Sequence, residues 1–571
     1  MNKILTILFT CCLTSAAGQH FLNLGFEYEI TGTNRPQKWR MVESGYAITL
    51  DSSEHVSPGK SLRIQSENPS KGAYGVCSAN FPLSMGKGKS IEFRARIKTE
   101  NVTGGYAGLF WSVVNKDMSL TLDKMDGRGL TGSNGWTDVK ISVAIDTAAN
   151  HIEFGGLLSG QGTAWFDDFE IFIDGLRFVD GQPLTAGPTA GDLAWLKRHI
   201  HPLETYNPAS PVSTDLDVLK GIVADAKVVA LGEVTHGSSE IFQMKHRIIK
   251  YMAETCGFNT FSIEANMPEA YRVNDYVRYG EGNAADLLQG MYFWTWQTRE
   301  VLDMVEWMRV YSEQGGEIQF TGFDMQFYSG ALKELEAAFS NDKTVLSMLS
   351  SVKTSLGDEK VSQQLPAPKT DSLELEKQLN MVRHLVSESG KTEREKRWLL
   401  QNIRIISQYI NYDGMTRDKF MAENLLWIKS SNRQAKIALW AHNFHIKKTE
   451  LSMGRYLHDS LGADYLSIGF AFHDGFYTAT GFKGLGSYKA QDPYVGTYED
   501  VFNSLDEPIF LLDLRTMSET EEERTGWFFR NLEFRDVGAV KTDNEFSETN
   551  LKDDYDLIIF IKESSSSHLL H

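Results

Sequence analysis

A glutamate and a histidine three residues apart, Glu233 and His236, lie in the short segment Leu231–Gly237. Histidine exchanges a proton near neutral pH, and a neighbouring carboxylate can fix its tautomer and stabilise its charged form. The pair could therefore activate a water molecule for hydrolysis. General-base assistance of this kind accelerates a reaction by roughly 10²–10⁴-fold.

The flanking residues indicate how this pair is positioned. Val228–Leu231 is a short apolar run rich in β-branched residues, which predicts a buried strand. Glycines at 232 and 237 follow it, and a helical pattern starts near Ser239. Glu233 and His236 are thus expected in a loop that leads from a strand to a helix.

Strand-like apolar runs recur through the second half of the chain. They are Val228–Leu231, Thr260–Ile263, Ile318–Thr321, Ile437–Trp440, Leu466–Phe470, Ile509–Leu512 and Leu557–Ile561. Helix-length segments separate the first of them, which favours a mostly parallel sheet covered on both faces. Residues 191–571 are therefore predicted to form an α/β domain. Residues 330–432 have a helical pattern broken at Pro366 and Pro368, and we expect a helical insertion there.

Reactive side chains stand at the ends of several of these strands. The second predicted strand ends at Glu264, the third at Asp324, and the fourth is followed by His442 and His445. In open parallel sheets the ligand site is the crevice outside the carboxyl ends of the strands. These residues are expected to meet Glu233 and His236 at one edge of the sheet.

Lys245 lies in the middle of the apolar arc of the predicted helix at residues 239–254. Helical side chains lean toward the N-terminus, so the Lys245 ammonium could reach the acids at the site. It could equally be an amine partly covered at the edge of an interdomain surface. His246 lies at the margin of the arc and is interpreted as structural.

The first half of the chain has period-two patterning. Ile91–Ile97 alternates apolar and polar residues throughout, and Gly, Asn and Asp-rich turns separate such runs. This predicts an antiparallel β-sandwich over residues 19–176, followed by a linker at residues 177–190. The segments at residues 23–27 and 164–169 resemble the jelly-roll carbohydrate-binding modules of secreted bacterial enzymes. That resemblance implies carbohydrate as a partner, with Trp39, Trp111 and Trp136 either stacking on sugars or packing the sandwich.

Composition excludes some partners. The chain has 571 residues, 42% apolar content and a net charge of −18, which predicts a folded multidomain protein that does not bind nucleic acid or anionic membranes.

Residues 1–18 have the cationic start, short apolar core and small-residue end of a signal peptide, which predicts a secreted or periplasmic protein. The run is too short to anchor the mature chain in a membrane, and Cys11 and Cys12 fit a lipoprotein signal poorly. The remaining Cys77 and Cys256 predict no disulfide framework.

Residues 190–571 resemble the erythromycin esterase family. The resemblance is carried by Leu231–Gly237, Phe242–Arg247, Ser262–Ala265, Asn274–Val277, Phe293–Trp296, Thr321–Asp324, Arg417–Asn424, Trp440–His445 and Tyr465–Phe470. It implies hydrolysis of a macrolide lactone or another ester, with His236 activating water. Lys245 replaces an arginine of some members and keeps its charge but loses planar two-point recognition of a carboxylate.

The residue types and the resemblance together define a candidate site. The predicted catalytic residues are His236, Glu233, Glu264 and His442. The predicted substrate-binding residues are Lys245, His445, Asp324, Asn443, Arg417 and Trp296. No Gly-x-Ser-x-Gly elbow is present in this half, and Ser238 and Ser239 are interpreted as helix caps, so direct attack by water is expected. No cofactor or metal is expected.

Three alternatives remain open at this stage. Glu233, His236, Glu264 and His442 could instead hold zinc or manganese, in which case a chelator would abolish activity. Glu233, Glu264 and Asp324 could act as acid and base on a glycosidic bond and release reducing sugar. The sandwich could be a surface glycan binder joined to an inactive second half. The leading prediction is a secreted hydrolase of a carboxylic ester or macrolide lactone, with antibiotic inactivation as one outcome.

Overall fold

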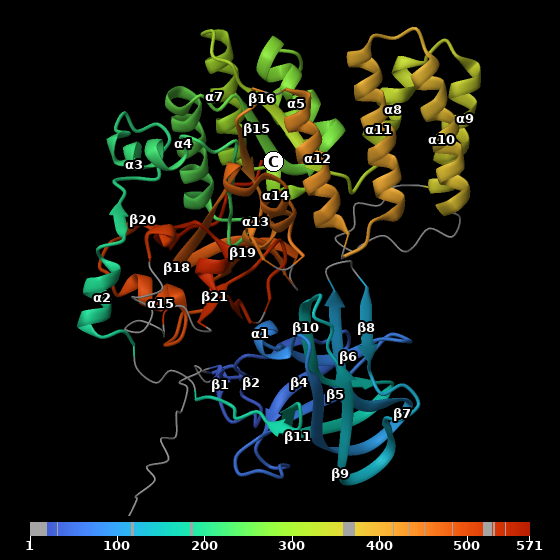
Figure 1. Ribbon diagram of the computed structural model, residues 1–571, viewed down its shortest axis with the longest axis vertical. Helices are drawn as coiled ribbons and strands as arrows, with labels where there is room; N and C mark the ends of the chain where they lie inside the picture. The colour runs from blue at the N-terminus through green and yellow to red at the C-terminus, as the bar shows by residue number, and fades with distance from the viewer. Residues whose placement is uncertain are drawn as a thin grey trace, which may run out of the picture. The chain divides into compact units, whose positions relative to one another are not determined.

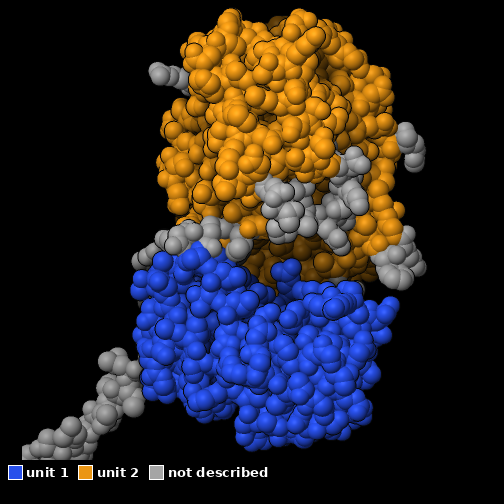
Figure 2. Space-filling view, turned by 90° about the vertical axis from the view of Figure 1, so that its right-hand side faces the viewer, with its two compact units in different colours: residues 1–115, 119–184, 523–531 blue, residues 116–118, 185–522, 532–571 orange. Residues whose placement is uncertain are grey.

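The computed structural model (Figure 1) describes residues 20–570 apart from residues 31, 116–118, 183–186, 358–371, 415, 433, 450, 482–483, 518–527, 529–531 and 543. The predicted signal peptide, Pro366 and Pro368 lie outside the described residues. The described chain divides into two compact units, which Figure 2 colours separately. The first contains residues 20–115 and 119–182, and the second contains residues 187–517 and 532–570.

The first unit is rich in antiparallel β-structure. Its main described sheet has the order β3 (Arg40–Val42), β6 (Tyr74–Asn80), β10 (Ala149–Ser159), β7 (Ser90–Asn115), β11 (Gln161–Ile173), β5 (Ser61–Ser66) and β4 (Tyr46–Asp51). β8 (Leu120–Asp123) and β9 (Leu130–Ala144) pair with β7, and β12 (Leu176–Arg177) pairs with β11. A separate pair is formed by β1 (Glu29–Ile30) and β2 (Arg35–Pro36), and α1 spans Leu83–Gly86. Within β7, Ile91, Phe93, Ala95 and Ile97 are all buried, so the alternation that predicted this strand points its apolar face into the core.

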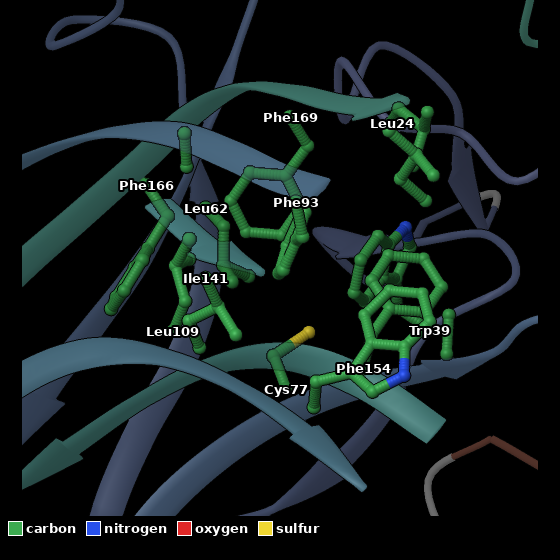
Figure 3. Packing of buried hydrophobic residues seen from close by; sticks show 14 of the residues in the cluster. Leu24, Trp39, Leu62, Cys77, Phe93, Leu109, Ile141, Phe154, Phe166 and Phe169 are labelled. Carbon is green, nitrogen blue, oxygen red and sulfur yellow. The ribbon is translucent and has the colours of Figure 1, made fainter. Parts of the chain in front are cut away.

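Aromatic rings fill the core of this unit (Figure 3). Phe154 lies 5.4 Å from Trp39 and 5.3 Å from Trp111 between ring centroids, and the two tryptophans are completely buried. The suggestion that Trp39 and Trp111 stack on sugars is therefore wrong, because neither ring can reach a ligand. Trp136 is half-buried. A count of tryptophans could not distinguish these cases, since core and surface rings look alike in the sequence.

The second unit is built on a mixed sheet with the order β13 (Ile200–Pro202), β20 (Ile509–Asp513), β23 (Leu557–Ser564), β18 (Tyr465–Gly481), β14 (Val228–Leu231), β17 (Ile437–Trp440), β15 (Thr260–Asn266) and β16 (Gln319–Asp324). The strands from β23 to β16 are parallel to one another, whereas β20 runs antiparallel to both of its neighbours, β23 and β13. β19 (Gly484–Lys489) pairs with the far end of β18. Every strand expected in this half is present.

The register of this sheet places the strand ends level with one another. Leu231 lies beside Trp440 and Ile468, and Trp440 lies beside Ile263. The residues that follow these positions must therefore emerge at the same edge of the sheet. This edge is the carboxyl end of the parallel strands, as the sequence predicted.

Helices surround the sheet and extend from it. They are α2 (Ala190–Leu196), α3 (Asp217–Ile222), α4 (Ser239–Cys256), α5 (Met267–Tyr279), α6 (Ala284–Gln289), α7 (Arg299–Glu313), α8 (Ser329–Ala338), α9 (Lys343–Leu356), α10 (Ser372–Glu388), α11 (Glu393–Asn411), α12 (Arg417–Ser431), α13 (Asn443–Ile446), α14 (Met453–Leu461), α15 (Tyr498–Asn503) and α17 (Leu551–Asp554). The short strands β21 (Glu533–Arg535) and β22 (Phe546–Glu548) pair with each other. The helices α8–α11 pack on one another, and α12 packs against β16 and α14 (Figure 1). Among the described helices, none is long and apolar enough to cross a membrane.

Candidate active site

The loop after β14 carries the candidate base. Gly232 comes so close to the Asn443 side chain that a Cβ there would lie 2.1 Å from its Oδ1 atom, which explains the glycine. Asn443 Nδ2 donates to the Phe470 carbonyl at 2.8 Å, and Asn443 Oδ1 accepts from Phe470 N at 3.1 Å. Asn443 is only 2% exposed, and these bonds tie α13 to β18. Its predicted contact with substrate stays a prediction.

His236, Glu233 and Lys245 form a continuous chain of hydrogen bonds. His236 Nδ1 lies 2.6 Å from Glu233 Oε1, and Lys245 Nζ donates to Glu233 Oε2 at 2.6 Å. The indole of Trp440 also donates to Oε2 at 2.6 Å. Since a carboxylate only accepts, Nδ1 of neutral His236 carries the proton, and its Nε2 atom is free to accept one.

Charge balance keeps Glu233 ionised. Burial opposes its ionisation, but Lys245 and His236 outweigh that effect, and the pKa of Glu233 is lowered. Burial lowers the pKa of Lys245 to about 8, partly offset by Glu233, so the amine stays charged at neutral pH. The Lys245 side chain is completely buried, and its Nζ lies 4.3 Å from the centre of the Trp440 ring. The Lys245 ammonium thus reaches the acid Glu233, the first of the two possibilities that the sequence left open. Its predicted contact with substrate stays a prediction.

A second charged network joins the ends of β15 and β16 to α12. Arg417 Nη2 donates to Glu264 Oε1 at 2.8 Å and to Asp324 Oδ2 at 2.7 Å. His445 lies between Asp418, 2.8 Å from its Nδ1 atom, and Glu264, 3.2 Å from its Nε2 atom. Glu264 and Asp324 are buried, while 17% of the Arg417 side chain is exposed. Arg417 is thus held in place by Glu264 and Asp324. A substrate-binding role for Arg417, Asp324 and His445 stays a prediction.

His445 is an imidazolium in this setting. Burial lowers its pKa, but Asp418 and Glu264 outweigh that and raise it to about 10. The pKa of Glu264 is held well below its usual range because His445 and Arg417 overcome the effect of burial. Arg417 Nη1 also lies 3.2 Å from His445 Nε2, but two donors cannot bond, so Nε2 donates to Glu264.

The protonation of His445 predicts a pH dependence of stability. The unfolded residue has a pKa of about 6.5, whereas the folded residue holds its proton to about pH 10. The folded state therefore binds more protons between these values, so the stabilisation is complete below about pH 6.5 and is lost as the pH rises to about 10. In chemical denaturation, the loss of unfolding free energy caused by His445→Gln should be largest at pH 6 and shrink toward pH 10. His384→Gln, on the exposed face of α10, should show no such trend, and a pH-independent His445→Gln effect would contradict the assignment.

His442 presents a buried donor next to the base. The backbone N–H of Phe444 donates to His442 Nδ1 at 3.3 Å, so neutral His442 carries its proton on Nε2. Burial, opposed only in part by Asp536, lowers the pKa of His442 to about 4, so the ring is neutral at ordinary pH. The ring centroid lies 5.2 Å from that of His236. Glu264 Oε2 accepts from His442 N at 3.1 Å and fixes this residue at the strand end.

Two buried N–H groups beside His236 have no hydrogen-bond partner among the described residues. They are Nε2 of His442 and Nε1 of Trp296, a tryptophan 1% exposed whose ring centroid lies 6.0 Å from that of His236. Leaving a buried donor unpaired costs roughly 1–3 kcal/mol. Such donors are stabilised when an acceptor oxygen binds to them, so each of these two groups near His236 is available to such an oxygen.

Comparison with known proteins gives a consistent picture. The model of the family described as erythromycin esterase matches residues 253–564, more than half of the chain. The chain belongs to the erythromycin esterase family. The match contains Glu264, Arg417 and His442 and begins downstream of His236, which the geometry joins to them.

Individual relatives agree with the family assignment. Erythromycin esterase type II of Escherichia coli is 24% identical over 448 residues, covering 66% of this chain and 99% of its own. The structure of an erythromycin esterase mutant, EreC in its open conformation, has 16% identity and a TM-score of 0.50 over 63% of this chain and 96% of its own, and so shares the fold. The first unit is similar to a xylan-binding CBM22 domain of Xyn10C from Paenibacillus barcinonensis, with 14% identity and a TM-score of 0.22 over 28% of this chain and 93% of that domain.

Sequence reasoning missed three residues of this erythromycin esterase family site. Trp440 was interpreted only as a strand residue, although its indole bonds Glu233. Asp418 follows Arg417 but had no role until its contact with His445 was known. Asp536 approaches His442 from a loop near the C-terminus, and no local pattern marks it.

One cavity of the second unit lies away from the candidate site residues. This cavity of about 560 Å³ is lined by residues of α4, α7 and the loop at residues 207–209, and none of the predicted site residues lines it.

Within the described part of the chain, no group of three or more His, Cys, Asp or Glu residues is arranged to hold a metal ion. The described cysteines, Cys77 and Cys256, are both free thiols.

Proposed function

We propose that this protein hydrolyses a carboxylic ester, such as a macrolide lactone, by direct attack of a water molecule that His236 activates. Family membership supports hydrolase activity in general. The observation that carries the finer proposal is His236 itself, whose Nδ1 atom is bound to buried Glu233 and whose ring lies 5.2 Å, between centroids, from that of His442, which has an unpaired Nε2 donor. Export of the protein is proposed from residues 1–18, and inactivation of a macrolide antibiotic would follow if such a lactone is the substrate.

The mechanism uses His236 as the base. Its Nε2 atom takes a proton from water as the water oxygen attacks the carbonyl carbon. The resulting imidazolium is stabilised by Glu233, which Lys245 and Trp440 keep ionised and in place. The same proton then passes to the leaving alkoxide as the C–O bond breaks. The products are one carboxylic acid and one alcohol, and the enzyme returns to its starting state.

Negative charge that develops on the carbonyl oxygen needs donors already in place. The Nε2–H of His442 is such a donor, and its low pKa keeps it a neutral imidazole at neutral pH. Trp296 Nε1 is a second unpaired donor beside His236. The Arg417 side chain is 17% exposed, and a guanidinium is suited to hold a carboxylate product.

The geometry favours this mechanism over the glycosidase alternative. A glycosidase needs one carboxylic acid that is protonated before it donates to the leaving group. Glu233 and Glu264 are both held ionised by neighbouring cations, and Asp324 is buried against Arg417. For a metal site, Glu233 would have to give up bonds to His236, Lys245 and Trp440. Loss of activity with a chelator, restored by one divalent ion, would favour the metal alternative.

A substrate panel tests the proposal. Macrolides and simple esters are incubated with the full chain, and the products are examined for a mass gain of one water, with His236→Ala as the blank. Hydrolysis of at least one compound by the wild type alone is expected. A covalently acylated protein during turnover, or release of reducing sugar from a glycan instead of a carboxylic acid, would overturn it.

A further inference from the structure

The loop from Asp536 to Val540 crosses the segment that carries the candidate base. Val537 N donates to the Val234 carbonyl at 2.8 Å, and His236 N donates to the Gly538 carbonyl at 3.4 Å. These main-chain bonds join two segments that are far apart in the sequence. They hold the residue at the start of the loop, Asp536, at a fixed position next to the site.

The Asp536 carboxylate reaches the donor of His442. Asp536 Oδ1 lies 3.4 Å from His442 Nε2, just beyond the usual range for an N–H···O hydrogen bond. The Asp536 side chain is 31% exposed, whereas that of His442 is 7% exposed, so the contact joins a buried donor to a partly exposed carboxylate. Because Phe444 N occupies Nδ1, the His442 atom that faces Asp536 is an N–H group.

We infer that Asp536 is a positioning residue of this site: its carboxylate orients the Nε2–H of His442 in the empty enzyme and yields that donor to the carbonyl oxygen of the substrate. Asp536 touches no reacting atom itself. The inference rests on the proposed function for the identity of the oxygen, but the contact between Asp536 and His442 can be tested without a substrate.

Two contacts hold the His442 ring at opposite sides. The Phe444 N–H fixes Nδ1, and Asp536 faces Nε2. The 3.4 Å separation leaves the Nε2–H without a hydrogen-bond partner, so the carboxylate attracts this donor without forming the short charged hydrogen bond that would compete with the substrate. Removing the carboxylate leaves the donor in place but held from one side only. An asparagine keeps an acceptor oxygen at this position and should preserve most of the orientation.

Nitrogen-15 spectra of histidine-labelled protein test the contact directly. The His442 ring signals are assigned by their loss in His442→Gln, and they should report the Nε2–H tautomer in the wild type. Asp536→Ala should shift these signals, while Asp492→Ala should not, because Asp492 is exposed and pairs with Lys489. His442 signals that are the same in Asp536→Ala and Asp492→Ala would overturn the inference.

Kinetics separate a positioning role from a structural one. Asp536→Ala is expected to lower kcat by about tenfold, with KM changed by less than about threefold, because donor orientation acts on the transition state. Asp536→Asn should keep at least about half of the wild-type kcat, since it retains the acceptor. An equal loss in both variants, together with a fall in Tm, would contradict the inference. If the wild type hydrolyses no ester, the proposed function fails, while the spectra still decide the role of Asp536.

Discussion

Replacing His236 with glutamine should lower kcat/KM for ester hydrolysis by about 10²–10⁴-fold, the range that general-base assistance provides. Glutamine has no group that takes a proton near neutral pH, but its amide N–H₂ can still donate to Glu233. The free energy of unfolding should therefore stay within about 1 kcal/mol of the wild type. KM should change little, because the ester is bound by other groups. The measurement is steady-state kinetics on the best substrate of the panel, together with urea denaturation.

The control for this variant is His384→Gln, which makes the same change at an exposed position of α10. It should leave kcat and stability unchanged. A His236→Gln enzyme that keeps more than about a tenth of the wild-type kcat/KM would remove His236 from the role of base. A loss of activity accompanied by unfolding would instead show that the histidine is needed for the fold.

Replacing Lys245 with methionine should destabilise the protein by about 3–5 kcal/mol, because it leaves the buried Glu233 carboxylate without its cation. Lys245 and Glu233 both have completely buried side chains and lie 2.6 Å apart. Trp440 and His236 still donate to Glu233, but neither carries a permanent charge. The midpoint of urea denaturation at pH 7 measures this loss. Activity should fall as well, since Glu233 would no longer be held ionised.

A second substitution tests the cause of that loss. Adding Glu233→Gln to Lys245→Met removes the uncompensated charge, so the double variant should recover part of the stability. Lys250→Met is the matched control, because Lys250 is a half-buried lysine on the same helix without an acidic partner among its described hydrogen bonds and ion pairs. A Lys245→Met effect below about 1 kcal/mol would mean that the pair is not ionised in the folded state.

The sequence predicted the sheet well because buried parallel strands read as uninterrupted apolar runs. Val228–Leu231 and Ile437–Trp440 begin and end in the structure where the patterns placed them. The convergence of Glu264 and His442 on His236 followed from their common position at strand ends. The position of Lys245 was left open, because a helical wheel shows that a lysine is buried but not which acid it meets.

Other parts of the site depend on contacts that leave no local trace. Asp536 lies on a loop whose own sequence gives no sign that it crosses the loop after β14. Asn443 and Lys245 are residues of the kinds that often contact ligands, yet in the structure both form hydrogen bonds within the protein. Whether a polar side chain binds a ligand or stabilises the fold depends on its neighbours in the folded protein, and these neighbours come from distant parts of the sequence.

The Trp440 indole belongs both to the packed interior of the sheet and to the hydrogen-bond chain that ends at His236. A substitution in the interior of this sheet that moves Trp440 therefore also moves its bond to Glu233, and a longer side chain at position 245 requires the Trp440 ring to repack. Substitutions that change substrate preference should therefore accumulate in parts that do not belong both to the packed interior and to this hydrogen-bond chain, such as the helices α8–α11 and the residues around Asp536. Relatives that share only a quarter of their residues with this chain could then keep the same site while recognising different substrates.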